Sequence, residues 1–313
     1  MEDFNLELIV KICKLKYIEK LQQKDIAKQL KLSTAKVTRM LQKAFDMEII
    51  QVNILDPQNT NSELESELEK KYGLKRVLVA KKEDDSKDDT KKIIGKKLAG
   101  YLMNIFKDND CIGISHSSTV KECVRALPLK ISRKVDVVQL LGGSYNLTFE
   151  GLDTTEEFSS KFGVYPHILY APLFVDSSEI RNVILKDSSI KKTFDYFNNV
   201  NIAIVGIGSF YPVGSSTIFR SGNLSKKEII ELQKSGVTGD IFGHFFDAAG
   251  NFCRTTVENR LITIPIENIE KIEYRIGAAG GSGKFNAILG AIKGKIINIL
   301  ATDENTADML INT

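Results

Sequence analysis

The sequence has few of the residues that most often build metal centres and disulfide frameworks. It holds only four cysteines and three histidines in 313 residues. The cysteines are scattered through apolar surroundings, without the paired spacing of a zinc site or the density of a disulfide scaffold. The histidines are equally far apart. We therefore expect buried free thiols, and neither a metal nor a cofactor.

Long apolar runs are also missing. None approaches the roughly 20 residues that cross a bilayer, and MEDFNLELIV at the start lacks the basic residues and small-residue cleavage site of a signal peptide. We expect a cytoplasmic protein with no membrane partner. Since 42% of the residues are hydrophobic, the chain is able to build a substantial core and two domains.

The net charge of +3 is concentrated at one end of the chain. Residues 1–54 hold 10 Lys/Arg against 7 Asp/Glu, whereas the other 259 residues hold 33 of each. Within residues 11–43 the excess sharpens to 10 basic against 2 acidic side chains. A short basic module joined to a neutral body is typical of a protein that reads a polyanion.

Three helical patterns follow one another inside the basic module. Residues 5–20 and 23–30 have apolar side chains at helical spacing, and Ser33 is a good N-cap for a third helix over 34–45. Small Ala27 lets another helix cross closely. The spacing predicts a helix-turn-helix. The residues expected to point inward are, in helix order, Leu6, Ile9, Ile12, Cys13 and Leu15; Ile26, Ala27 and Leu30; and Val37, Met40, Leu41 and Ala44.

The outward face of the third helix mixes hydroxyl and cationic side chains, which suits phosphates and base edges. We expect Lys36 and Arg39 to contact bases or phosphates, and Thr34 and Thr38 to contact phosphates. A solvated lysine-rich hairpin, or a module that binds protein, is the alternative. The predicted DNA-binding set is Gln23, Ser33, Thr34, Lys36, Thr38, Arg39 and Lys43.

Two features after the third helix predict where the first domain ends. Residues 48–54 alternate Ile50, Val52 and Ile54, which indicates one strand of a wing. The polar segment PQNTN at 57–61 then breaks the helical pattern. We predict a winged helix-turn-helix DNA-binding domain over residues 1–56 and a second domain over residues 57–313.

Helical and strand patterns alternate through the second domain. A charged helix, SELESELEKKYG, comes first and ends at Gly73. Because the apolar runs lack alternation, we expect strands buried on both faces, hence a doubly wound, mostly parallel α/β body. The predicted strands are 76–80, 111–115, 135–141, 202–208, 261–266, 272–276 and 296–302, and the main helices are 90–106, 178–186, 225–234 and 284–293.

Ligands bind such sheets outside the carboxyl ends of the strands. Segments with suitable chemistry at that edge combine hydroxyl residues, paired glycines, a buried carboxylate and a lysine. A sugar hydroxyl or a backbone amide could each partner that carboxylate, Asp240. These segments are GISHSST (113–119), QLLGG (139–143), GIGSF (206–210), TGDIFGHFFD (238–247) and GAAGGSGKF (277–285).

The last of these segments is only partly a phosphate loop. The Walker type needs Gly, four residues, Gly, Lys and then Ser or Thr. Here Phe285 follows Lys284, and Ala278 stands in place of the first glycine. A strand, a turn of small residues and a helix N-terminus remain, and together they favour an anion site over an NTPase. A bare strand-to-helix turn is the alternative.

A catalytic reading has little support in the sequence. A catalytic triad could be formed from Asp240, His244 and Ser209, but the sequence has no GxSxG motif, which marks the nucleophile of such enzymes. Lys284 could form a Schiff base, yet beside a glycine turn at a helix start it is better placed as a phosphate counter-charge.

Several motifs together resemble the SorC family of bacterial sugar-responsive transcription regulators. They cover nearly the whole chain in order. The resemblance implies an effector domain similar to sugar-phosphate isomerases and CoA transferases, which binds a phosphorylated sugar, modulates operator affinity, often as a repressor, and assembles as a homo-oligomer, a dimer or tetramer. The motifs are QQKDIAKQLKLSTAKVTRML, LEKKYGL, VVQLLGG, NIAIVGIGS, SGVTGDIFGHFFDAAG, AAGGSGKFNAI and INILATDENTADML.

The resemblance also implies residue roles. Ser117, Ser118 and Thr119 match the phosphate loop, Lys284 the phosphate-contacting lysine, and Asp240 the acidic residue that binds effector hydroxyls. The implied effector-binding set is Ser115, Ser117, Ser118, Thr119, Gln139, Gly142, Gly143, Gly208, Arg220, Asp240, Gly280, Gly281 and Lys284.

Three positions depart from the family pattern. His116 lies in the phosphate loop, which commonly reads Ser-Trp-Gly, and Thr34 replaces a frequent arginine of the reading helix. Leu141 stands where other members have a lysine or an arginine. An apolar side chain makes neither an imine nor an ion pair, which argues against deoxyribose 5-phosphate held by imine chemistry and against fructose 1,6-bisphosphate. The expected function is a DNA-binding regulator controlled by a phosphorylated sugar or polyol and not an enzyme, with a sugar-phosphate isomerase-like enzyme as the alternative.

Overall fold

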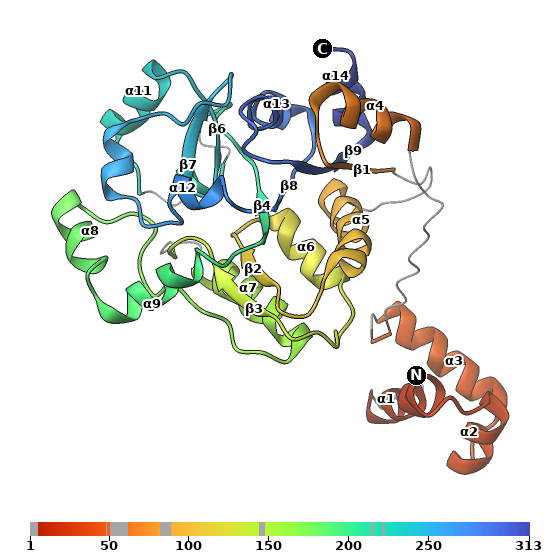
Figure 1. Ribbon diagram of the computed structural model, residues 1–313. Helices are drawn as coiled ribbons and strands as arrows, with labels where there is room; N and C mark the ends of the chain where they lie inside the picture. Colours follow the sequence, from red (N-terminus) through yellow and green to blue (C-terminus); the bar gives the residue numbers. More distant parts are fainter. Residues whose placement is uncertain are drawn as a thin grey trace. The chain divides into compact units, whose positions relative to one another are not determined.

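The chain divides into two compact units, Met1–Asp56 and Pro57–Thr313. Figure 1 gives the ribbon of each unit. The boundary segment predicted at 57–61 lies outside the described residues. The computed structural model describes residues 6–47, 49–50, 62–81, 89–143, 148–213, 216–220 and 223–313.

The first unit is a small helical bundle around its own apolar core. Its elements are α1 (Leu6–Cys13), a π-helical turn (Lys14–Ile18), α2 (Gln23–Leu30) and α3 (Thr34–Asp46). Ser33 caps α3 by accepting a hydrogen bond from the backbone N–H of Lys36 at 3.2 Å. The three predicted helices are confirmed. Every residue expected inward lies in the core or packs against it, except Leu6.

Two details of the first unit differ from the sequence prediction or lie beyond it. Leu6 is 53% exposed, because it begins α1 and nothing in the described part of the unit covers it. The wing predicted over 48–54 lies mostly outside the described residues. Ile49 and Ile50 form a bend, with both backbone N–H groups donating to the carbonyl of Ala44. The wing therefore stays a prediction.

The second unit is built on a six-stranded, entirely parallel sheet, as predicted. The strand order is β1-β9-β8-β4-β2-β3. Two of the central strands, β2 and β9, are buried along their whole length, which explains their unbroken apolar runs. The strands are β1 (Arg76–Ala80), β2 (Cys111–Ile114), β3 (Asp136–Gln139), β4 (Ile202–Gly206), β8 (Tyr274–Ala278) and β9 (Ile299–Asp303).

Helices cover both faces of this sheet, which confirms the doubly wound arrangement (Figure 1). One apolar core lies under α5 (Thr90–Ile105), α6 (Ser118–Ala126) and α7 (Thr148–Phe162). The other lies under α4 (Ser62–Tyr72), α13 (Phe285–Lys293) and α14 (Glu304–Ile311). The four cysteines are buried and free, as expected.

A second sheet, which the sequence analysis did not predict, lies beside the first. It is antiparallel, in the order β5 (Gly208–Ser209), β6 (Val237–Ile241) and β7 (His244–Asp247). Its strands are short and rich in glycine and aromatic residues, so no periodicity revealed them. This sheet matters for function because it supports Gly208 and Asp240, which face each other in the β5–β6 register.

Two predicted strands were wrong in part. Residues 261–266 form no strand: Leu261 and Thr263 make isolated bridges to loops, and Ile266 begins α12 (Ile266–Ile269). The strand predicted over 296–302 begins only at Ile299, because Lys295 turns the chain with a φ of 53°. In both places apolar residues fill the core from a loop, which a pattern of hydrophobicity alone does not distinguish from a strand.

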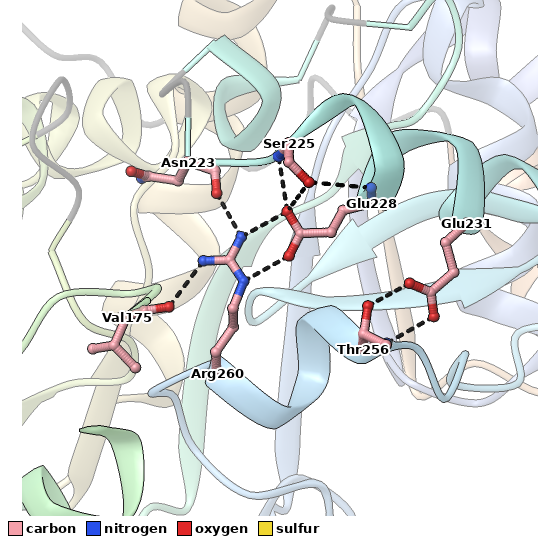
Figure 2. Close-up of polar contacts among 7 residues, drawn as sticks. All are labelled: Val175, Asn223, Ser225, Glu228, Glu231, Thr256 and Arg260. Carbon is pink, nitrogen blue, oxygen red and sulfur yellow. Dashed lines mark hydrogen bonds and ion pairs between the residues drawn. The ribbon is translucent and has the colours of Figure 1, made fainter. Parts of the chain in front are cut away.

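Shorter elements surround the second sheet, and one arginine connects several of them (Figure 2). Arg260 binds both carboxylate oxygens of Glu228, at 2.7 and 3.0 Å. It also donates to the carbonyls of Val175 and Asn223. Since Glu228 belongs to the capping box that begins α11, Arg260 holds that helix against two loops. The shorter elements are α8 (Ser178–Ile184), α9 (Ser188–Tyr196), α10 (Thr217–Arg220), α11 (Lys226–Lys234), η2 (Thr256–Arg260) and η3 (Ser282–Lys284).

No helix in the described part of the chain is long and apolar enough to cross a bilayer. Among the same residues, no group of three or more His, Cys, Asp or Glu side chains is arranged to hold a metal ion.

Candidate functional site

A polar cavity of about 290 Å³ opens where strands of both sheets end. This is near the lower limit of small-molecule sites, which run from about 300 to 1,000 Å³. The cavity lies at the carboxyl ends of β2 and β4, where the sheet rules place ligands. Its lining is Lys91, Ser115, His116, Ser117, Ser118, Leu141, Leu173, Gly206, Ile207, Gly208, Ser209, Tyr211, Pro212, Ser216, Ile218, Asp240, Phe242, Gly243, Gly283 and Lys284.

The N-terminus of α6 forms one corner of the cavity. Ser117 is the N-cap, and its hydroxyl accepts a hydrogen bond from the backbone N–H of Thr119 at 3.3 Å. The end of β4 lies so close that a Cβ on Gly206 would stand 2.4 Å from Ser117 Oγ. Only glycine permits this approach. The corner therefore presents hydroxyls, free helix N–H groups and the positive end of a helix dipole, all of which favour an anion.

Lys284 reaches into the same cavity from the start of α13. Its Nζ donates a hydrogen bond to the carbonyl of Ile207 at 2.7 Å. Burial lowers the pKa of Lys284, while the nearby Asp240 carboxylate opposes that shift. An ammonium group held in a partly desolvated position is well placed to interact strongly with an anion, because little water competes.

Among the described residues of the lining, Asp240 on β6 is the only one with a carboxylate. Burial raises its pKa to about 6, and the Ser216 hydroxyl and the Lys284 ammonium work against that rise. Its Oδ1 is shielded from solvent and has no hydrogen-bond partner among the described residues. A buried acceptor without a donor is costly, so this oxygen is suited to receive a hydroxyl from a ligand.

Gly208 makes room for that carboxylate. A Cβ at this position would lie 2.0 Å from Asp240 Oδ1 and 2.6 Å from its Cγ. We predict that Gly208→Ala displaces the carboxylate and weakens sugar binding about tenfold or more, with a stability loss of about 1–3 kcal/mol from overpacking. Titration calorimetry and urea unfolding measure the two effects.

Gly143→Ala is the matched control for Gly208→Ala. Nothing lies within 4 Å of a Cβ built at Gly143, and the residue does not line the cavity. Equal sugar affinity in the two variants would contradict the role given to Gly208.

One part of the cavity wall is apolar. Leu141, Leu173, Ile218 and Phe242 contribute to it, and all four are buried. Position 141, where the family resemblance implies a lysine or an arginine, therefore presents a hydrocarbon surface. A second phosphate at this wall would lose water without gaining a counter-charge.

Six of the thirteen predicted effector residues meet at the cavity: Ser115, Ser117, Ser118, Gly208, Asp240 and Lys284. Three others are placed elsewhere. Thr119 is buried within α6. Gln139 is fully buried and donates to the carbonyl of Leu141 at 2.7 Å. Gly142 packs against the backbone of Ala171 and Pro172.

Three of the remaining four predicted residues, Gly143, Gly280 and Gly281, also lie outside the lining. Gly143 donates its N–H to the carbonyl of Ala171. Gly281 donates its N–H to Asp303 at 2.7 Å and to Thr306 at 3.0 Å, so this amide is not available to an anion. Gly280 packs against the same Asp303 carboxylate. The side chain of Arg220 lies outside the described residues.

Sequence reasoning did not select several lining residues. Ser216, Leu173 and Phe242 approach from loops and Ile218 from the short helix α10, and no local pattern indicates where such segments fold back. Lys91 had a usable signal, because it lies in the first turn of the helix that follows β1. The rule that ligands gather beyond the carboxyl ends of strands applies to that helix start as well.

The residues considered for a catalytic triad do not assemble. His244 Nδ1 lies 3.1 Å from both carboxylate oxygens of Glu258, and its Nε2 lies 2.9 Å from the carbonyl of Ile264. These contacts place the imidazole against η2, whereas Asp240 faces the cavity. His244 is therefore a structural residue in this fold.

In the first unit, the predicted DNA-binding residues lie at the surface. Thr34, Thr38 and Arg39 are exposed, and Lys36 and Lys43 are half-buried. Thr38 Oγ1 donates to the Gln23 side chain at 2.9 Å, which links α3 to the start of α2. Ser33 is engaged as the N-cap.

A helix-turn-helix unit with a cationic outer face, joined to an α/β unit with a polar cavity, defines a ligand-controlled DNA-binding regulator. Comparison with known proteins identifies the group more closely. Residues 56–312 match the Sugar-bind family, described as "Putative sugar-binding domain". The chain belongs to the SorC family of sugar-responsive transcription regulators.

Relatives match over nearly their entire length. The deoxyribonucleoside regulator of Bacillus subtilis is 30% identical over 308 residues, which are 98% of this chain and 97% of the relative. Transcriptional regulator LsrR of Enterobacter sp. (strain 638) is 30% identical, over 96% of this chain and 91% of the relative. The crystal structure of the full-length sorbitol operon regulator SorC from Klebsiella pneumoniae superposes with a TM-score of 0.76 at 28% identity, covering 99% of this chain and 100% of that one. The resemblance inferred from the motifs is confirmed, as is the sugar-modulated DNA-binding class.

Proposed function

We propose that a phosphorylated sugar or polyol binds the cavity of the second unit and changes the affinity of the first unit for double-stranded operator DNA. The observation that supports this most is the combination, in one cavity, of a helix N-terminus, the Lys284 ammonium and the unpartnered oxygen of Asp240. Binding that favours one state over another shifts operator affinity by linkage, typically by about 1–3 kcal/mol.

The chemistry of the lining orients the ligand. Its phosphate would lie against the hydroxyls of Ser117 and Ser118 and the N-terminus of α6, with Lys284 as counter-charge. Its hydroxyls would bond to Asp240. The apolar wall at Leu141 disfavours a second phosphate, so we propose a monophosphate. The names of the relatives, which include sorbitol and erythritol regulators, are compatible with a small polyol.

Fluorescence anisotropy with DNA from the chain's own promoter region tests the proposal. We expect binding to this DNA in preference to random DNA, and a change in affinity when a sugar monophosphate is added. Unphosphorylated sugars are the control and should have little effect. Equal binding to promoter and random DNA, with or without sugar phosphates, would rule the function out.

We predict that Lys36→Ala and Arg39→Ala each weaken promoter binding about tenfold, because each removes a charged contact. If the lost contact is to phosphate, the slope of log K against log salt should become shallower by about 0.9. Anisotropy titrations at several salt concentrations measure both quantities. Lys11→Ala, which removes the same charge from the exposed face of α1, is the control; an effect as large as those at α3 would contradict the assignment.

We further propose that the chain is not an enzyme. The relatives are named regulators, and the residues considered for a catalytic triad do not assemble, because His244 is bound to Glu258 and Ile264. We also propose a homo-oligomer, dimer or tetramer, whose paired helix-turn-helix units read half-sites about one helical turn, or a multiple of it, apart. Size-exclusion chromatography with light scattering, and footprinting of the operator, examine these two points.

A further inference from the structure

Lys91 is the second lysine of the cavity lining, and no motif assigned it a role. It lies in the first turn of α5, whose N-cap Asp89 accepts a hydrogen bond from the Lys91 backbone N–H at 3.3 Å. That first turn contains no acidic residue. Cations at a helix N-terminus interact unfavourably with the helix dipole. Lys91 is such a cation, and an unfavourable charge of this kind beside a cavity indicates a functional role.

The packing of α5 against α6 determines where Lys91 lies along the axis of α6. Both helices follow strands of one parallel sheet and lie side by side on one face, so they run in the same direction (Figure 1). Gly95 is their point of close approach, since a Cβ there would lie 2.6 Å from the backbone N of Cys123. One turn back along each helix, Lys91 comes level with Ser118 and Thr119. Lys91 therefore stands beside the first turn of α6.

The start of α5 also contacts the turn that leads to Lys284. A Cβ on Gly280 would lie 2.6 Å from Cδ1 of Ile94, three residues after Lys91. The first turn of α5 is thus held between α6 on one side and the glycine turn before Lys284 on the other. Both lysines line the same cavity, and the charge of Lys91 contributes to lowering the pKa of Lys284.

We propose that Lys91 is a second cationic contact for the anionic end of the effector, so that a dianionic phosphate is bound between Lys91, Lys284 and the N-terminus of α6. This inference rests on the proposed function and names a specificity-determining residue for it. Two ammonium groups match the two charges of a phosphate monoester, whereas a carboxylate or an uncharged hydroxymethyl group would leave their mutual repulsion partly uncompensated. Lys91 is exposed, so its side chain has room to close over the ligand.

Isothermal titration of the full-length chain with glucitol 6-phosphate and with inorganic phosphate tests Lys91. We expect Lys91→Ala to weaken the binding of both probes about tenfold, because one charge-assisted contact to phosphate is lost. Lys91→Arg should retain most of the affinity. Glucitol, which has no phosphate, should bind the wild type and Lys91→Ala equally weakly.

Lys92→Ala is the matched control, because Lys92 is the next residue of the same first turn, is exposed and does not line the cavity. It removes the same net charge and relieves the same helix dipole. If Lys91→Ala and Lys92→Ala bind glucitol 6-phosphate equally well while Lys284→Ala does not bind it, the role of Lys91 is overturned and the proposed function stands. If the wild type binds neither probe, the phosphate site itself is overturned.

Discussion

Lys284→Ala is expected to lose about a hundredfold or more in affinity for sugar monophosphates. The Lys284 ammonium lines the same cavity as the α6 N-terminus and donates to the carbonyl of Ile207 at 2.7 Å. A hydrogen bond from a charged group contributes about 1.5–3 kcal/mol. The substitution also leaves Asp240 without its nearby cation. The loss of the charged contact and the loss of this cation both weaken the binding of the ligand.

The measurement is isothermal titration with a panel of pentose, hexose and polyol monophosphates. Calorimetry is preferable to a thermal-shift assay here, because removing a partly desolvated lysine changes the stability of the free protein as well. Lys293→Ala is the control, since Lys293 is exposed in the last turn of the same helix, away from the cavity. Unchanged monophosphate affinity in Lys284→Ala would show that the phosphate lies elsewhere.

The sequence was most informative where each local signal agreed with the fold. Ser33, Ala27 and the inward residues of α3 predicted the helix-turn-helix closely, because cap, crossing residue and apolar stripe reinforce one another. The buried strands of the parallel sheet were equally clear, since a strand covered on both faces is apolar throughout.

The site was most predictable where its residues follow a strand of the parallel sheet. Ser117 and Lys284 do so, and both line the cavity. Phe242 and Ile218 approach from the β6–β7 turn and from α10, and their position depends on tertiary contacts that no local pattern encodes. At the Gly280–Gly281 turn, by contrast, the sequence predicted a binding role that the structure does not support. The glycines of this turn resemble a phosphate-binding turn, but the amide of Gly281 already donates to Asp303 at the end of β9 and to Thr306 in α14, some 20 residues further along the chain.

Asp240→Asn is expected to stabilise the protein at neutral pH while removing its response to sugars. Burial raises the pKa of Asp240 to about 6 from an ordinary value near 3.8, so at pH 7 the folded chain holds an ionised carboxylate that its surroundings disfavour. At about 1.36 kcal/mol per pKa unit, the cost is at most about 3 kcal/mol. Asparagine removes this charge, as at other functional sites where stability is sacrificed for activity.

The sign of the effect follows from proton uptake. Between about pH 4 and pH 6 the folded wild type keeps a proton on Asp240 that the unfolded chain has released, so wild-type stability falls as pH rises through this window and is constant above it. The advantage of Asp240→Asn should therefore be near zero at pH 4, grow up to pH 6 and level off. Urea unfolding of both proteins across pH 4–8 measures this difference, and calorimetry with sugar monophosphates checks the loss of binding. An advantage that does not change with pH would mean that the Asp240 carboxylate ionises in the folded chain as it does in water. In that case Oδ1 of Asp240 would be hydrated, and it would not be an unpartnered acceptor for a ligand hydroxyl.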